Sequence, residues 1–452
     1  MRLSDFMTLD QRQLPVWLAA LFALVYLHSM GGAFQFDDFN VIVDLATVHS
    51  LERWLADVGQ GIRPLLKLSY LLNWISGWDL IGFHAVNLLI HGATVWLVYR
   101  LAQEFLAAKE LLQSLPLAPL LSAALFALHP ANTEAVTYIS GRSSSLMTLL
   151  YLAGLLAHAL RPVGQGLWRT RLLVPMCFVM ALAVKESAVT FPLALLIWDM
   201  ACGEKWKVGV RKGWTSWATL LMVAAYFLWN DAYRASAERS ASFNSLTGNL
   251  ATQAQALVYL MRQWALPLWL NIDPDLTVQH NLSGAMWGLG FVLALLLVTV
   301  LTWRTRAWIG FALAWALLHL LFLHLFFPRL DVANDRQLYL AAWPLCLALV
   351  VELQLRLPTR IAAALVAALL LGYAMLTFLR NQDYQSETAL WAQTVRVSPD
   401  KSRVHSNLGY AYQLAKKPVQ ARLEYLQALR LDPDNVKARL NLRRLNARPE
   451  AG

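Results

Sequence analysis

The chain of 452 residues is 58% hydrophobic and 15% charged, with a formal net charge of +10 at pH 7. Soluble domains carry about 25% charged residues, so this composition excludes an ordinary soluble globular protein. The positive charge is a weak sign of nucleic-acid binding, because lysine and arginine gather in short loops between apolar segments and act there as topology signals. The cysteines, Cys177, Cys202 and Cys346, lie in apolar segments without a Cys-x-x-Cys spacing, which supports neither a disulfide framework nor a thiolate metal site.

Apolar segments recur along the chain, and they predict an all-α membrane protein with about eleven spanning helices. Many similar segments follow the first one, which we therefore expect to be an uncleaved span and not a signal peptide. The fifth and sixth segments are short and suit a hairpin that barely crosses the bilayer. The expected spans are 15–33, 81–101, 115–131, 143–160, 171–184, 187–201, 214–230, 285–303, 307–326, 336–353 and 361–379.

Basic loops predict the orientation of these spans. Lysine and arginine cluster in five loops that fall on the same side of the predicted bundle. The positive-inside rule places that side in the cytoplasm, together with the N-terminus. The segment 132–142, the turn at Lys185 and Glu186, the loop 231–284, the segment 327–336 and the C-terminus are then expected outside. The five clusters are 100–109, 161–171, 205–212, 304–306 and 356–360.

Two outer stretches are predicted to be helices at the membrane surface. Residues 39–60 mix apolar and charged positions at helical spacing, which is typical of a helix lying in the interface. Residues 250–271 also have a helical pattern, but Arg262 and the nearby prolines argue against a full span. We expect this second stretch to form a partly embedded or interfacial helix.

Polar, helix-forming residues fill the end of the chain and repeat with a 34-residue period. Trp391 corresponds to Tyr425 across this period, and Pro399 corresponds to Pro433. The small and aromatic residues between them have the spacing of tetratricopeptide repeats, with about one complete repeat. Such a tail is either a stabilising cap or a binding groove. The expected domains are 1–380, a membrane domain, and 381–452, a tetratricopeptide-like helical tail.

Two adjacent carboxylates, Asp37 and Asp38, follow the first span in the sequence FQFDDFN. They cannot both point the same way, and like charges raise one pKa, which favours a general base. The alternative is a solvated helix start with Asp38 or Asn40 as its N-cap. Of the pair, Asp38 is preferred as the base, because partial burial beside Phe39 would raise its basicity.

Other ionisable residues fall on the same outer face. Lys185 and Glu186 interrupt an apolar stretch, where ionisable groups are costly and usually functional; the alternative is an ion pair at a hairpin tip. Arginines at the mouths of spans either clamp an anionic phosphate or anchor a helix at the head-groups. A similar choice, between function and an interfacial turn, applies to the histidine, glutamate and tyrosine near them. The residues concerned are Arg63, His129, Glu134, Arg142, Arg336 and Tyr339.

The convergence of these groups indicates chemistry. Carboxylates and several cations on one face suit removal of a proton from a hydroxyl while a leaving phosphate is stabilised, as in glycosyl transfer from a lipid-phosphate sugar. A non-enzymatic membrane scaffold that presents the repeats is the alternative, and a transporter is a third, although transporters hold ionisable groups near mid-membrane. Convergence of Asp37, Lys185 and Arg336 on one cavity would favour the enzyme. No cofactor is required: carboxylates able to bind a divalent cation are present, but no ligand spacing demands one.

Seven elements in order carry a resemblance to a known family. The chain contains FQFDDFN, RPLLKLSYLLNW, FHAVNLLIHG, HPANTEAVTYISGR, AVKES, DRQLYLAAWP and the repeat tail. In this order they resemble the transmembrane-and-tetratricopeptide (TMTC) O-mannosyltransferases and their bacterial relatives, which belong to the GT-C superfamily of membrane glycosyltransferases. The stretch HPANTEAVTYISGR is the most specific element. The short tail distinguishes the chain from the animal members and indicates a bacterial relative.

The resemblance implies a GT-C-like bundle and an inverting transferase that uses a polyprenyl-phosphate sugar, with undecaprenyl phosphate as the bacterial carrier. It implies a base at Asp37 or Asp38 and a Ser/Thr hydroxyl of a secreted or membrane protein as acceptor; a glycan or lipid acceptor is the alternative. The implied location is the bacterial inner membrane, with active loops and repeats on the periplasmic side, in contact with membrane lipid and not with nucleic acid. The implied donor-phosphate contacts are Arg63, Arg142, Lys185 and Arg336, supported by His129, Glu134, Glu186 and Tyr339.

Overall fold

The computed structural model describes residues 13–160, 168–326, 328 and 331–447. Every regular element in these residues is a helix, and no strand occurs among them. The prediction of an all-α membrane protein is therefore confirmed. Part of the predicted basic loop 161–171 lies outside the described residues.

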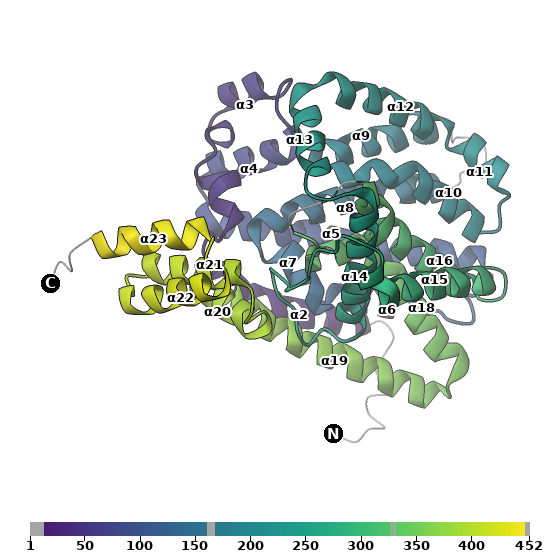
Figure 1. Ribbon diagram of the computed structural model, residues 1–452. Coiled ribbons are helices and arrows are strands. Elements are labelled where there is room, and N and C mark those ends of the chain that lie inside the picture. The colour runs from purple at the N-terminus through teal and green to yellow at the C-terminus, as the bar shows by residue number, and fades with distance from the viewer. Residues whose placement is uncertain (1–12, 161–167, 327, 329–330, 448–452) are drawn as a thin grey trace.

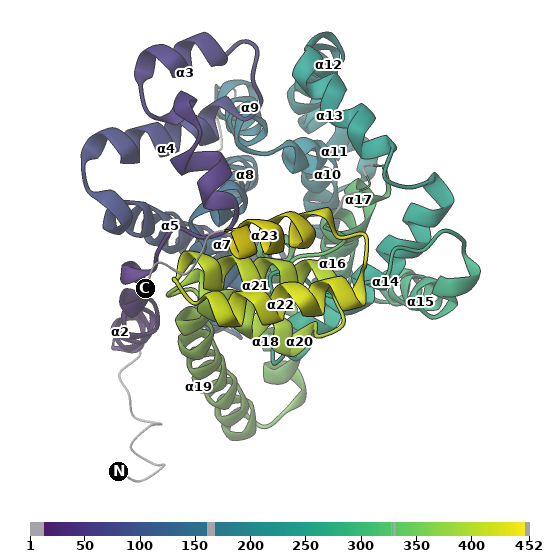
Figure 2. The same ribbon diagram turned by 60° about the vertical axis from the view of Figure 1, so that its left-hand side comes forward.

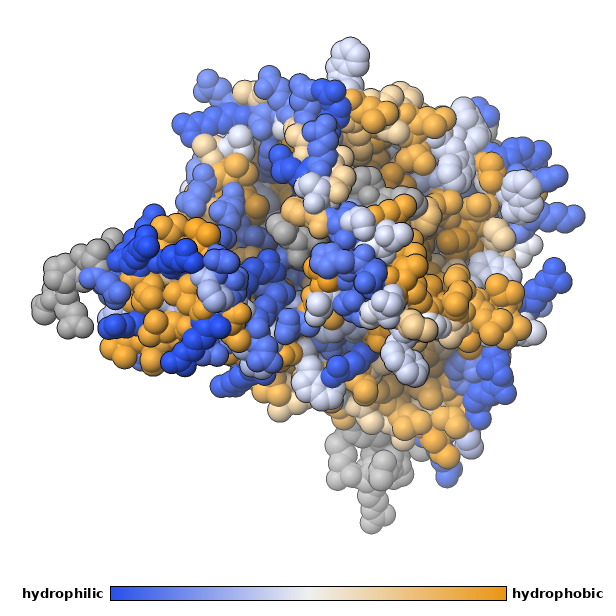
Figure 3. Space-filling model, in the orientation of Figure 1, coloured by the Kyte–Doolittle hydropathy of each residue, from blue (hydrophilic) through white to orange (hydrophobic). Residues whose placement is uncertain are grey.

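Six stretches of the described chain are helical, long and apolar enough to cross a membrane. They agree with six of the predicted spans, and burial of each stretch inside the bundle varies from 17% to 67%. Figure 3 shows hydrophobic residues gathered over α15 and α16, with hydrophilic residues at both ends of that face. The helices that make up these stretches are α2 (Leu14–Tyr26), α5 (Asp79–Ala108), α15 (Met286–Thr302), α16 (Ala307–Leu317) with α17 (Leu323–Phe326), α18 (Leu338–Arg356) and α19 (Thr359–Asp383).

The other five predicted spans coincide with helices that are shorter or less apolar. An α-helix rises about 1.5 Å per residue, so 11 residues reach roughly half of a 30 Å hydrocarbon core. The sequence did not distinguish them from full spans, because apolar residues continue through the turns that end them. The count of about eleven spans stays a prediction. These helices are α6 (Ala118–Ala127), α8 (Arg142–Ala159), α9 (Val174–Val184), α10 (Phe191–Ala201) and α12 (Trp214–Trp229).

Short helices connect the bundle. The predicted surface helix at 39–60 is broken into a π-helix, a 3-10 turn and α3 (Leu51–Asp57). The break has a local cause: the Ser50 side chain accepts a hydrogen bond from the Arg53 amide and so starts a new helix. The stretch predicted at 250–271 overlaps α14, which begins earlier, at Leu246, and ends at Ala265 before a proline. The remaining connecting helices are α4 (Pro64–Ser76), α7 (Thr133–Val136), α11 (Trp206–Lys212), α13 (Asp231–Ala241) and α14 (Leu246–Ala265).

Buried aromatic rings lock the centre of the bundle. Trp198 of α10, Trp315 of α16 and Trp343 of α18 are each no more than 2% exposed. Trp315 and Trp343 meet edge to face with ring centroids 5.6 Å apart, and Phe311 contacts both. Such pairs add stability beyond the area that they bury. The helices α10, α16 and α18 are thereby held in fixed relation to one another.

Four helices after α19 form the tail: α20 (Glu387–Val397), α21 (Ser402–Leu414), α22 (Pro418–Leu431) and α23 (Val436–Ala447). A Cβ at Gly409 would lie 2.7 Å from the Tyr425 ring, so the glycine lets α21 and α22 approach closely. The tail lies at one end of the molecule, away from α11 and the turns that join α15 to α16 and α18 to α19 (Figure 1). The domain boundary after residue 380 stays a prediction, since α19 continues to Asp383.

Candidate active site

A cavity of about 950 Å³ lies beside the tail-facing ends of the bundle helices, and five of the ten candidate residues line it. They come from four separate places in the chain: the loop after α2, the start of α4, the turn between α9 and α10, and the turn before α18. Figure 2 shows α3 and α4 on one side of this region and α12 and α13 on the other. This convergence is what an enzyme requires and a scaffold does not. The five residues are Asp37, Arg63, Lys185, Glu186 and Arg336.

The adjacent carboxylates face opposite ways. Asp38 is fully buried, and its carboxylate accepts hydrogen bonds from the backbone amides of Gln35 at 2.9 Å and Ser140 at 2.8 Å. Asp37 is half-buried and lines the cavity, while its own backbone amide donates to the Tyr138 hydroxyl at 2.9 Å. The structure therefore favours Asp37 as the base, against the sequence-based preference for Asp38, because Asp38 serves to close the loop.

Burial raises the pKa of Asp37 above its ordinary value of 3.8, the positive charge of Arg336 lowers it in part, and the Asp331 carboxylate adds to the rise. Burial also raises the pKa of Asp38, to about 7, although the bonds from Gln35 and Ser140 oppose the rise. A carboxylate with a raised pKa is a stronger base. Asp37 thus combines access to the cavity with an environment that suits proton abstraction.

Arg63 and Glu186 form an ion pair across the cavity wall. The Arg63 guanidinium donates from Nε to Glu186 Oε1 at 2.9 Å and from Nη2 to Oε2 at 2.7 Å. Arg63 has φ of 55°, a left-handed conformation that is uncommon for a residue with a side chain, and Pro64 then starts α4. Its backbone amide donates to the Tyr233 hydroxyl at 3.3 Å. Arg63 therefore reaches the cavity with its charge balanced by Glu186.

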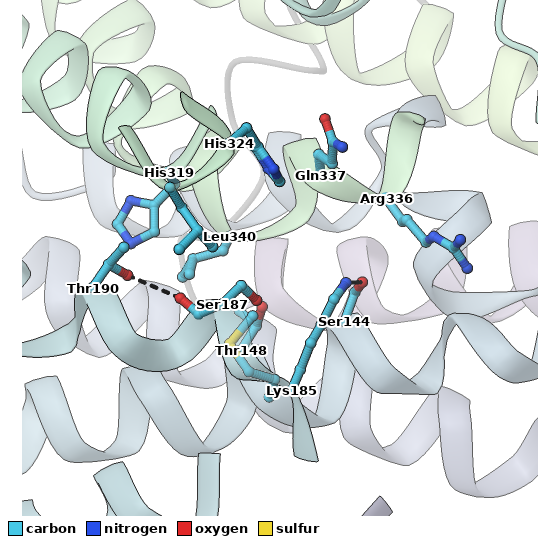
Figure 4. A pocket seen from close by; sticks show the side chains of 12 residues that line it. Ser144, Thr148, Lys185, Ser187, Thr190, His319, His324, Arg336, Gln337 and Leu340 are labelled. Carbon is cyan, nitrogen blue, oxygen red and sulfur yellow. Dashed lines mark hydrogen bonds between the residues drawn. The ribbon is translucent and has the colours of Figure 1, made fainter. Parts of the chain in front are cut away.

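A small recess of about 30 Å³ adjoins the cavity and gathers cations and hydroxyls (Figure 4). The Lys185 ammonium donates to the Ser144 hydroxyl at 2.7 Å, and Lys185 is only 8% exposed. Lys185 and Arg336 line both the recess and the large cavity. Cations beside hydroxyl donors form charge-assisted hydrogen bonds with anionic oxygens. Other polar residues of the recess are Thr148, Ser187, Thr190, His319, His324 and Gln337.

Glu134 forms an ion pair with Arg336. Its carboxylate is 1% exposed; Oε1 lies 3.4 Å from Arg336 Nε, and Oε2 accepts a hydrogen bond from the Arg336 backbone amide at 3.1 Å. Glu134 does not line the cavity. It affects the site through Arg336, because these two contacts hold Arg336 in its orientation.

Besides Asp38 and Glu134, three predicted site residues do not line the cavity. Arg142, predicted to bind the donor phosphate, starts α8 with its side chain turned into the core, where Nε donates to Asn87 Oδ1 at 2.6 Å and the other nitrogens donate to carbonyl groups. His129 bonds to the Trp264 carbonyl at 3.0 Å. The Tyr339 hydroxyl bonds to His91 at 2.7 Å. The phosphate contact predicted for Arg142 and the supporting roles predicted for His129 and Tyr339 stay predictions, and none of the three residues lines the cavity. An ionisable residue beside an apolar segment can equally find its partners inside the bundle.

The sequence analysis missed the apolar wall of the cavity. Leu220, Val223 and Phe227 of α12 supply it, together with Tyr233 of α13. The helix α12 is apolar throughout, so its sequence does not distinguish a cavity face from a lipid face. Asp331 was also missed, although it belongs to a charged outer segment that could have signalled it.

Within the described part of the chain, no group of three or more His, Cys, Asp or Glu side chains is placed to hold a metal ion. The acidic residues near the cavity are engaged by cations or backbone amides in several cases, as Glu134 is by Arg336 and Glu186 by Arg63. The chemistry available at the site is that of a carboxylate, cations and hydroxyls.

Comparison with known proteins identifies similar chains. A protein O-mannosyl-transferase of Caenorhabditis elegans is 24% identical over 445 residues, covering 92% of this chain and 62% of that protein. The protein O-mannosyl-transferase TMTC3 of Homo sapiens is 22% identical over 481 residues, covering 93% of this chain and 51% of that protein. Tmtc1 of Drosophila melanogaster is 33% identical over 187 residues, covering 38% of this chain and 21% of that protein.

The chain is a relative of the TMTC protein O-mannosyl-transferases. This TMTC relative spans only about half to three fifths of the two long matches, at 51% and 62% of their lengths. No family model matches it, and no solved structure matches it. The similarity over nearly the whole chain and the six apolar helices indicate a multi-pass membrane protein.

Proposed function

We propose that the chain is a glycosyltransferase that moves mannose from a polyprenyl phosphate to a Ser or Thr hydroxyl of a protein. One observation carries the proposal: a single cavity joins the Asp37 carboxylate, the cations Lys185 and Arg336, and an apolar wall from α12. The relatives are named protein O-mannosyl-transferases, which supports mannose as the sugar and a protein as the acceptor.

The donor has two parts that match the two halves of the cavity. The polyprenyl chain lies along Leu220, Val223 and Phe227, where its burial is favourable by about 0.8 kcal/mol per CH₂ group. The phosphate lies at Lys185 and Arg336, which stabilise the charge that develops on the leaving oxygen. The hydroxyls of the recess supply further donors to the phosphate.

Asp37 acts as the general base. It accepts the proton of the acceptor hydroxyl while that oxygen attacks C1 of the sugar from the face opposite the phosphate. The bond from C1 to the phosphate oxygen breaks, its electron pair stays on the phosphate, and the polyprenyl phosphate leaves. A single displacement of this kind inverts the configuration at C1. Lys185 and Arg336 supply positive charge to the leaving phosphate in this step.

We place the site on the extracytoplasmic face of a bacterial plasma membrane, with undecaprenyl phosphate as the carrier. The support is the position of three basic segments: α11 and the turns that join α15 to α16 and α18 to α19 lie away from the tail (Figure 1). The tail lies at the same end as the cavity, since Arg403 of α21 donates to Asp331 at 2.8 Å and Asp331 lines the cavity.

The test is turnover with defined substrates. The full chain, purified in lipid nanodiscs, is incubated with synthetic undecaprenyl-phosphate mannose and a Ser/Thr-rich peptide, and the peptide is analysed by mass spectrometry. The expected result is a hexose on Ser or Thr that is absent with Asp37→Asn. A scaffold would leave the donor intact. Donor consumption that depends on an added glycan or lipid, without modified peptide, would redirect the proposal to those acceptors.

A further inference from the structure

The tail and the loop that carries Asp37 share one hydrophobic core. Trp391 and Leu390 of α20 and Leu408 of α21 are buried in a cluster that also contains Tyr138, the hydroxyl partner of the Asp37 amide. Phe36 packs against the same cluster. The residue immediately before Asp37 is therefore part of the tail's core and not only of the membrane bundle.

Phe36 and Trp391 form an aromatic pair, and Phe36 has an uncommon backbone conformation. The ring centroids are 5.1 Å apart with planes at 83°, an edge-to-face arrangement, and Trp391 is fully buried. Phe36 has φ of 45°, in the left-handed region that is uncommon for a residue with a side chain. Strain of this kind persists only where the surroundings hold the residue in place. The Trp391 ring is the aromatic partner that holds the Phe36 side chain.

Three anchors fix the loop around Asp37, and they differ in origin. The Asp38 carboxylate accepts hydrogen bonds from the Gln35 amide within the loop and from the Ser140 amide of the bundle. The Tyr138 hydroxyl accepts from the Asp37 amide. The third anchor, Trp391, comes from the tail, 354 residues along the chain from Asp37. The tail adds a backbone link close by, in which the Ala33 amide donates to the Gln385 carbonyl at 3.4 Å.

We propose that Trp391 of α20 is a positioning residue for Asp37: by holding Phe36 in its left-handed conformation, it directs the Asp37 carboxylate into the cavity. The tail then contributes to catalysis by orienting Asp37, and it is more than a stabilising cap or a surface for partners. The inference rests on the proposed function, in which Asp37 is the base. It concerns kcat alone, because Trp391 does not line the cavity where Lys185 and Arg336 meet the donor.

The experiment compares variants on both sides of the contact in the full chain, with undecaprenyl-phosphate mannose and the peptide as substrates. Trp391→Ala removes the ring, and Trp391→Phe keeps an aromatic edge. Phe36→Gly removes the side chain while glycine accepts the left-handed backbone without strain, so it tests the same contact if Trp391→Ala folds poorly. Tyr425→Ala is the matched control, since Tyr425 is the fully buried aromatic one repeat further along and lies outside this cluster.

Trp391→Ala and Phe36→Gly are expected to lower kcat roughly 10- to 100-fold with the donor KM unchanged, because small misplacements of a catalytic group have effects of this size. The acidic limb of kcat/KM is expected to move to lower pH, as a freed Asp37 becomes better solvated. Trp391→Phe should recover most of kcat, and Tyr425→Ala should leave KM and the pH limb as in the wild type. A merely structural role would reduce the active fraction without moving that limb.

Failure of the positioning role and failure of the proposed mechanism would give different results. If Trp391→Ala and Phe36→Gly both keep the wild-type kcat and pH limb while Asp37→Asn is inactive, the positioning role is wrong and the base assignment stands. If Asp37→Asn keeps full activity, the proposed mechanism itself is overturned, and the positioning role falls with it.

Discussion

At the scale of single residues, the way charges are paired decides what each cation in the cavity can do. Arg63 donates three hydrogen bonds to Glu186, so its positive charge is largely balanced within the cavity wall. Lys185 donates a hydrogen bond to the Ser144 hydroxyl at 2.7 Å, and its ammonium can form a charge-assisted hydrogen bond with a phosphate oxygen. The Arg336 guanidinium is contacted by Glu134, whose Oε1 lies 3.4 Å from its Nε.

Asp37→Asn is expected to lower kcat/KM by about 10²–10⁴-fold, the usual contribution of a general base. The amide keeps the shape of the side chain but cannot accept a proton. In the wild type, kcat/KM should fall as the pH drops through the pKa of Asp37, because the protonated carboxyl is inactive. Burial raises that pKa above 3.8, so the fall should begin at a higher pH than for an ordinary aspartate. Rates with a defined peptide between pH 4 and 8 test this, and an unchanged acidic limb in Asp37→Asn would contradict it.

Arg336→Ala is expected to lower donor use about 10- to 100-fold and also to lower the amount of folded protein, because the buried Glu134 loses its counter-ion at a cost of about 3–5 kcal/mol. The double variant Arg336→Ala with Glu134→Gln separates the two effects. It should restore the yield and thermal stability of the purified protein while donor KM stays high. Recovery of donor use in the double variant would show that Arg336 does not contact the donor.

Access to the cavity could be predicted for some residues and not for others, for a physical reason. Lys185 and Glu186 interrupt an apolar stretch, where an ionisable side chain is energetically costly. That cost was a sufficient signal of function for both residues. The choice between Asp37 and Asp38 depends on the Ser140 amide, which lies 102 residues away, so no local pattern contains it. Arg142 has the same kind of signal as Arg336, and only the fold shows that Asn87 meets it inside the bundle.

At the scale of elements, helix length and the faces of α12 limited what could be predicted. The positions of the long spans followed from apolar runs, but helices such as α10, Phe191–Ala201, are too short to span by themselves. On α12, cavity-lining residues alternate with residues that face outward: Val223 lines the cavity, whereas Leu221 is 72% exposed. Because both faces are apolar, periodicity carries no information about which one meets the donor.

That arrangement predicts a dependence on the length of the lipid chain. The double variant Leu220→Ser with Val223→Ser should raise the KM for undecaprenyl-phosphate mannose about 10- to 100-fold, from lost burial of apolar area. The matched control is Leu221→Ser with Met222→Ser, on the outward face, where 72% and 74% of the side chains are exposed. A short-chain donor of two isoprene units should show little difference among the three proteins. Equal KM changes in both double variants would show that the apolar wall does not bind the donor.

At the scale of the whole molecule, charge is distributed unevenly between two ends. The turns that hold Arg304, Arg306, Arg356 and Arg360 lie away from the tail, as does α11 with its basic residues. At the other end, an ion pair joins the tail to the cavity: Arg403 contacts Asp331 at 2.8 Å, and Asp331 lines the cavity. A second pair, between Lys401 and Asp273 at 2.7 Å, joins the tail to the segment after α14. The cavity and the tail therefore face the same side of any membrane in which the bundle sits.

This asymmetry makes a topology experiment a test of the whole proposal. An alkaline phosphatase fused after Gly452 should be active, and a green fluorescent protein at the same place should be dark, because the tail is expected outside the cytoplasm. Fusions after Gly203, in the turn before α11, should give the opposite pair of results and serve as the control. A fluorescent tail fusion would place the cavity in the cytoplasm as well, since Arg403 and Asp331 tie the two together. The donor would then have to be presented from the cytoplasmic leaflet, and an acceptor outside the cell membrane could not reach Asp37.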